Sequence, residues 1–182
     1  MKIIDNLFRR KEPKEPWPLR FDSYSFDARC HNTLRCSIIF DRTQFALTRE
    51  LNGPSGEPHR PDWKEHWNAG FGSTEEFETR GFPSPVDIKW TALDGIERET
   101  EIDLETVFPG HEILHNVPRE SVDEYWATHM KHHAWIYLEI NDRTINIYIE
   151  ARVPTNIIED PIECPDKIIS HYDMLLAWTK TY

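Results

Sequence analysis

Five residues, His111-Glu112-Ile113-Leu114-His115, match the H-E-x-x-H pattern of zinc hydrolases. On a helix this spacing places two imidazole ligands one turn apart, with the glutamate beside them as a general base. The flanking residues disfavour a long helix, because Pro109-Gly110 precedes the motif and Pro118 follows it. A third ligand would have to come from a downstream glutamate or from one of three histidines at no recognised spacing: His129, His132 and His133. We therefore predict no metal, no catalytic residue and no cofactor, and we expect residues 111–115 to form a turn or short helix.

A second pattern places an acid at every second position of one predicted strand. Its members are Glu97, Glu99, Glu101, Asp103 and Glu105. Alternate side chains of a strand share one face and are about 6.6–6.8 Å apart, so the five carboxylates form a ladder. Like charges stacked in this way cost stability. The ladder fits a solvated edge that resists aggregation, and it also fits a surface for a basic protein partner. We predict that it binds a partner.

The clearest structural signal is the alternation of residues 133–154, which predicts a β-hairpin. Six aliphatic residues can share one face only if the loop between the strands has an even number of residues. They are Ile136, Leu138, Ile140, Ile145, Ile147 and Ile149. That face should cover a core, and the other face carries Trp135, Tyr137 and Tyr148. Trp135 and Tyr148 are therefore candidate aromatic anchors for a partner, in competition with the acidic ladder.

A second hairpin is predicted over residues 86–104, where Val86, Ile88 and Trp90 alternate before an Asp94-Gly95 turn. Its apolar residues share a face only if the loop is odd in length. Leu93-Asp94-Gly95, with Gly95 in the left-handed conformation, satisfies that condition.

Helical signals are shorter. A capping pattern predicts a short helix at residues 62–67, and Ser121 with Glu124 predicts another whose inner stripe includes Tyr125 and Trp126. A C-terminal helix capped by Asp166 is predicted from the spacing of Ile168, Ile169, Tyr172, Leu175 and Leu176. We expect an α+β fold, with antiparallel β-hairpins and about three short helices. Residues 1–20 form an extended lead-in rich in proline and charge, and residues 21–182 form a single antiparallel domain.

Composition restricts the function classes. The formal net charge of −11 disfavours nucleic acid and anionic membranes as partners and favours a cationic partner. The three cysteines, Cys30, Cys36 and Cys164, are odd in number and form no C-x-x-C pair, which argues against a disulfide framework. No apolar run approaches the length of a membrane span, and the basic N-terminus lacks the features of a secretory signal. These features predict a cytoplasmic protein.

Four segments carry a resemblance to a known group of proteins. They are V-D-I-K-W-T-A-L-D-G-I-E-R-E-T-E-I-D-L, V-P-R-E-S-V-D-E-Y, I-Y-L-E-I-N-D-R-T-I-N-I-Y-I-E-A and A-W-T-K-T-Y, all within residues 86–182. This half of the chain resembles small bacterial proteins of toxin–immunity loci, associated with type VI secretion or related polymorphic toxins. The resemblance implies a protein that binds and neutralises a toxin, and it transfers no active-site residue. Many members of such groups carry a lipoprotein signal, which this sequence does not show.

The sequence therefore predicts a non-enzymatic immunity protein that occludes a cognate toxin by direct contact, and the net charge favours a basic toxin. The alternative from a different class is a metal-dependent hydrolase that uses His111, Glu112 and His115. A structural or adaptor module with the same fold is the third hypothesis.

Overall fold

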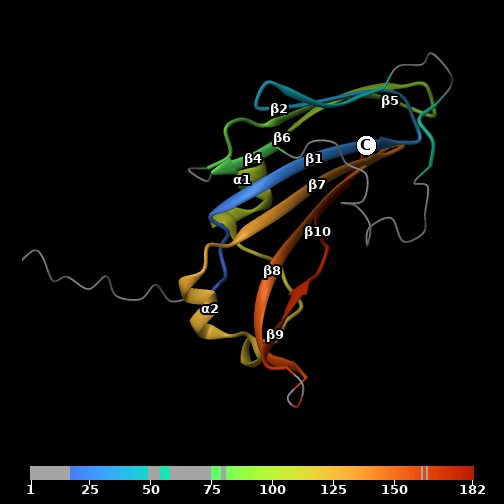
Figure 1. Ribbon diagram of the computed structural model, residues 1–182. Helices are drawn as coiled ribbons and strands as arrows, with labels where there is room; N and C mark the ends of the chain where they lie inside the picture. The colour runs from blue at the N-terminus through green and yellow to red at the C-terminus, as the bar shows by residue number, and fades with distance from the viewer. Residues whose placement is uncertain (1–16, 49–53, 58–74, 79–80, 161, 163) are drawn as a thin grey trace, which may run out of the picture.

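The computed structural model describes residues 17–48, 54–57, 75–78, 81–160, 162 and 164–182. Its strands form two sheets that face one another, with the four-stranded sheet above the six-stranded sheet in Figure 1. The order in the smaller sheet is β3 (Thr43–Thr48), β2 (Thr33–Phe40), β5 (Val86–Ala92) and β6 (Glu97–Ile102). The order in the larger sheet is β10 (Leu175–Thr181), β8 (Thr144–Asp160), β7 (His133–Asn141), β1 (Ser23–His31) and β4 (Glu75–Glu78), and β9 (Cys164–Tyr172) also pairs with β8.

The β7–β8 hairpin has the register that its alternation predicts. Ile140 lies opposite Ile145 and Asn141 opposite Thr144, so the turn residues are Asp142 and Arg143. All six aliphatic side chains of the predicted face are fully buried, at 0% exposure. The prediction of an even loop is confirmed. A loop with one residue more or fewer would have turned the three aliphatic side chains of one strand to the outer face.

The three-residue loop predicted for the β5–β6 hairpin is also confirmed. Ala92 donates its backbone N–H to the carbonyl oxygen of Ile96 at 3.4 Å, which leaves a three-residue loop. Gly95 closes that loop with a φ of 78°, a conformation that favours glycine. Val86, Ile88 and Trp90 consequently face the core together with Ile102.

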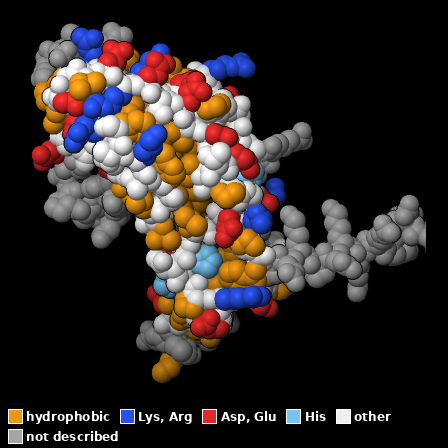
Figure 2. Space-filling model, turned by 180° about the vertical axis from the view of Figure 1, so that it is seen from behind, with side chains coloured by type: hydrophobic (Ala, Val, Ile, Leu, Met, Phe, Trp, Pro, Cys, Tyr) orange, Lys and Arg blue, Asp and Glu red, His pale blue; other side chains and the backbone are white. Residues whose placement is uncertain are grey.

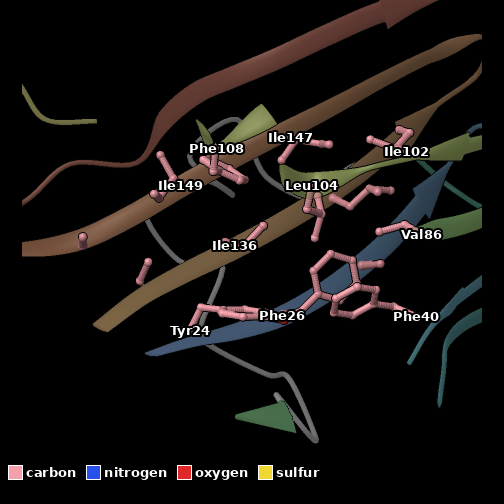
Figure 3. Close-up of a cluster of buried hydrophobic side chains, with 14 of the residues drawn as sticks. Tyr24, Phe26, Phe40, Val86, Ile102, Leu104, Phe108, Ile136, Ile147 and Ile149 are labelled. Carbon is pink, nitrogen blue, oxygen red and sulfur yellow. The ribbon is translucent and has the colours of Figure 1, made fainter. Parts of the chain in front are cut away.

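The core lies between the two sheets and is rich in aromatic rings on one side (Figure 3). Phe26 of the larger sheet contacts Phe40 and Phe45 of the smaller one, with ring centroids 4.7 and 4.9 Å apart. Trp90 is buried and donates its indole N–H to the backbone oxygen of Asp142 at 2.9 Å. This hydrogen bond fastens the smaller sheet to the turn of the β7–β8 hairpin.

The predicted fold class is wrong, because the structure is nearly all β. Its described helices are α1 (Leu104–Val107), α2 (Glu124–His129) and the 3₁₀ turns η1 (Pro109–His111) and η2 (Arg119–Ser121). The segment predicted as a C-terminal helix forms β9 and β10, which run beside β8 in nearly continuous register, with Tyr172 opposite Arg152 and Leu175 opposite Ile149. The long edge of β8 supplies backbone partners that local spacing cannot reveal, so tertiary context overrides the helical pattern.

Two further differences concern local detail. β1 and β7 pair in parallel, so the larger sheet is mixed rather than purely antiparallel. The helix predicted after Ser121 exists as α2, but its N-cap is Asp123 and both Tyr125 and Trp126 are exposed. The helix predicted at 62–67 lies outside the described residues.

Within the described residues, we find no helix with the length and apolar character that a bilayer crossing requires.

A disulfide joins Cys30 of β1 to Cys36 of β2. The chain passes from one sheet to the other between these two cysteines, at Asn32, whose φ is 51°. The odd number and the spacing of the cysteines argue against a disulfide framework, but the structure contains this one disulfide. The cross-link ties the two sheets together at the corner where the chain changes sheet.

We predict that reducing this disulfide lowers the free energy of unfolding by about 2 kcal/mol, the loop-entropy value for so short a closed loop. Thermal or urea unfolding with and without a reductant measures the difference. Cys36→Ser should show the same loss and become insensitive to the reductant, whereas Cys164→Ser should retain the sensitivity. Three reactive thiols in the native protein, purified without reductant, would contradict the cross-link.

Candidate functional site

The acidic ladder lies along one edge of the smaller sheet. Glu97, Glu99 and Glu101 of β6 are exposed, and β6 is the last strand of that sheet. The ladder continues into α1, where Asp103 is the N-cap and accepts a hydrogen bond from the backbone N–H of Glu105 at 2.9 Å. The five predicted residues thus form one continuous exposed acidic edge, which we call the acidic edge.

Two cations lie near the acidic edge, and they act differently. Lys89 of β5 pairs across the strands with Glu99, with Nζ 2.8 Å from Oε1, and this contact raises the pKa of Lys89. Arg98 instead turns to the hairpin loop, where it makes a two-point contact with Asp94 at 3.0 and 2.7 Å. This hydrogen bonding lowers the pKa of Asp94 to about 2. Exposed pairs of this kind contribute little energy, so the acidic edge stays negative and open to a stronger partner.

The backbone of the acidic edge has a described strand partner on one side. In the part of the chain that the structure describes, β6 pairs with β5 and no other strand. A charged edge strand discourages pairing with another chain of the same kind.

The two aromatic candidates lie on the outer face of the larger sheet, and they differ in accessibility. Trp135 is half-buried and packs edge-on against His133, with ring centroids 4.9 Å apart. Tyr148 is only 4% exposed, packs with Tyr137, and donates its hydroxyl proton to Glu139 in a contact of 3.5 Å. Burial, followed by the charge of Glu139, raises the pKa of Tyr148. Tyr148 therefore offers almost no surface to a partner, whereas Trp135 offers part of its ring.

The outer face of the larger sheet carries buried ionisable groups that sequence inspection missed. Asp27 of β1 lies beside Tyr137 of β7, and both are buried, as is Glu139. Asn146 donates an amide N–H to Glu139 Oε1 at 2.9 Å. Burial raises the pKa of Asp27 to about 6, although its hydrogen bond from the Ala28 N–H opposes the shift. Local sequence cannot reveal the burial of Asp27, because that burial depends on the pairing of β1 with β7.

A serine pair holds one histidine on the same face. The hydroxyl oxygens of Ser23 and Ser25 lie 2.8 and 2.9 Å from the two ring nitrogens of His133. Ser25 is buried, and the two hydroxyl groups fix the orientation of the imidazole. Among the described residues, no three His, Cys, Asp or Glu side chains converge in a way that could hold a metal ion.

The H-E-x-x-H segment does not form the helix that a zinc hydrolase requires. His111 ends the 3₁₀ turn η1 with a φ of 60° and stacks on Phe21, with ring centroids 5.1 Å apart. Glu112 has an extended backbone and forms an isolated antiparallel β-bridge with Arg20. The ring centroids of His115 and Trp17 are 5.8 Å apart. The two imidazoles are therefore engaged in separate aromatic contacts. Of the other histidines, His129 and His132 have ring nitrogens near backbone oxygens of α2, at 2.8 and 3.0 Å.

Asp27 makes the stability of the protein depend on pH. Its pKa is raised in the folded state above the unfolded value, so the folded state takes up a proton between about pH 4 and 6 that the unfolded state lacks. Above pH 6 the buried charge costs up to about 2–3 kcal/mol. We predict that Asp27→Asn is more stable than the wild type at pH 7–8 and loses this advantage near pH 4. Urea unfolding across that range measures it, with the exposed Asp87→Asn as control; equal stability of Asp27→Asn and wild type at pH 7 would contradict the assignment.

Comparison with known proteins identifies no relative of this chain. No family model matches the sequence, and neither a curated protein nor a solved structure matches the chain. A function is therefore inferred from the residues of this chain.

Proposed function

We propose that this protein is a non-enzymatic immunity protein that neutralises a basic protein toxin by binding it at the acidic edge. The observation that carries the proposal is the continuous exposure of Glu97, Glu99, Glu101, Asp103 and Glu105 along β6 and the start of α1. The resemblance of residues 86–182 to proteins of toxin–immunity loci supports the same class of function. The acidic edge lies within that half of the chain.

Electrostatics explains why such an edge suits a toxin inhibitor. A toxin that acts on phosphates presents a basic groove, and a row of carboxylates offers that groove the same charge as its substrate. The net charge of −11 extends the attraction over the whole molecule and speeds the encounter. Fast association benefits an immunity protein, because a free toxin causes damage before it is bound.

The compartment belongs to the proposal as well. The cysteine count predicts the cytoplasm, but the Cys30–Cys36 bond favours an oxidising compartment, where disulfides form and persist. The oxidation state of these two cysteines in the cell therefore decides which compartment the proposal requires.

We predict that the double variant Glu99→Lys/Glu101→Lys slows association with the toxin by about tenfold or more at low salt, and that added salt reduces the difference. Its stability should change little, because exposed charges contribute little to folding. The measurement is association and dissociation kinetics at two salt concentrations, with the product of the neighbouring reading frame as the candidate toxin.

The matched control is Glu57→Lys/Glu159→Lys, which changes the net charge equally at exposed positions outside β6 and α1. Equal slowing by both double variants would show that only the overall charge matters and would contradict a specific acidic edge. Unchanged association for the first variant, beside a large rise in dissociation for Trp135→Ala, would place the binding site on the larger sheet.

A further inference from the structure

Helix α2 presents two large aromatic side chains outward. Tyr125 is 62% exposed and Trp126 is 46% exposed, and their rings meet edge to face with centroids 5.3 Å apart. His129 stacks on Tyr125 at 4.4 Å and thereby fixes the ring from its other side. We call Tyr125, Trp126 and His129 the α2 aromatic patch. Figure 2 shows hydrophobic side chains gathered in the lower half of the molecule, the end where Figure 1 places α2.

The α2 aromatic patch is held rigidly. Asp123 caps the helix by accepting the backbone N–H of Trp126 at 3.1 Å, and Ala127 is buried beneath it. Val122, which precedes the N-cap, forms an isolated antiparallel β-bridge with Thr155 of β8. A rigid exposed aromatic pair loses little conformational entropy when another segment covers it.

Acidic side chains rim this patch. Glu120 and Glu124 are exposed, and Asp123 is half-buried. Asn156 of β8 donates an amide N–H to the backbone oxygen of Glu120 at 2.9 Å and so fixes the rim to the sheet. An occupant of this surface should therefore combine apolar side chains with positive charge.

The described chain begins beside this surface. Its first residue, Trp17, lies under the Arg119 guanidinium, which is 5.2 Å from the ring centroid, and Arg119 opens η2 just before α2. In Figure 1 the blue start of the described chain lies next to α2. The sixteen preceding residues are therefore tethered next to the α2 aromatic patch.

Those sixteen residues have the required composition. Their apolar side chains include Ile3, Ile4, Leu7 and Phe8. Their five basic side chains, Lys2, Arg9, Arg10, Lys11 and Lys14, outnumber the three acidic ones, Asp5, Glu12 and Glu15. The eight residues between Phe8 and Trp17 span up to about 30 Å when extended, well beyond the length of roughly 9 Å of α2.

We propose that residues 1–16 dock on the α2 aromatic patch of the same molecule, with their apolar side chains on Tyr125 and Trp126 and their basic side chains toward the acidic rim. The tether supplies an effective concentration in the millimolar range, so a weak contact suffices. This docking is independent of the acidic edge, because β6 and α1 take no part in it.

Trypsin tests this docking, because it cleaves after Arg9, Arg10 and Lys11. In the full-length protein, cleavage at these sites should be about tenfold or more slower than in a synthetic peptide of residues 1–16, since proteolysis follows the population of the undocked segment. Tyr125→Ala/Trp126→Ala should restore fast cleavage. The control Tyr172→Ala/Leu176→Ala removes two side chains of similar exposure, 51% and 50%, from another surface and should leave the protection intact.

Mass spectrometry of the released N-terminal fragments gives the rate at each site, and circular dichroism verifies that each variant is folded. Cleavage of the full-length protein as fast as that of the free peptide would overturn the proposal. Protection that survives the Tyr125→Ala/Trp126→Ala change would also overturn it. Protection that disappears on dilution would show that a second copy of the chain supplies the segment, and would overturn docking within one molecule.

Discussion

The structure depends on the burial of one aliphatic face, which the β7–β8 hairpin presents to the smaller sheet. All six of its side chains are fully buried, and each contributes about 1.5–3 kcal/mol through removal from water. The face is continuous because an even turn keeps Ile140 opposite Ile145. Trp90 fixes the smaller sheet over this face by its hydrogen bond to Asp142, and the aromatic rings of β1, β2 and β3 fill the remaining space on one side.

This arrangement decides where charge can lie. Carboxylates that alternate with core residues on an interior strand become buried, as Asp27 and Glu139 are, and they require partners or a raised pKa. Carboxylates on an edge strand stay in water, as Glu97, Glu99 and Glu101 do. The same alternating pattern of acids therefore has two outcomes, and strand order distinguishes them. Only the edge set is available to a partner, which is why we place the binding function there.

The sequence predicts those features whose cause is local. Alternation and turn parity give both hairpins and their buried faces, because side-chain direction repeats every two residues along a strand. The exposure of the acidic edge follows from the same rule. The C-terminal helix was predicted wrongly because Ile168, Ile169, Tyr172, Leu175 and Leu176 fit a helical stripe, and only the free edge of β8 selects the strand. The parallel pairing of β1 with β7 joins segments about one hundred residues apart, so the burial of Asp27 could not be predicted.

The central claim is that the acidic edge receives the partner. Hydrogen–deuterium exchange of the chain alone and of its complex with the toxin tests that claim most directly, because it reports which backbone amides become protected. We expect slowed exchange concentrated in residues 97–105, with little change on β3, the opposite edge of the same sheet. Slowed exchange on the outer face of β7 and β8, with none in residues 97–105, would contradict it.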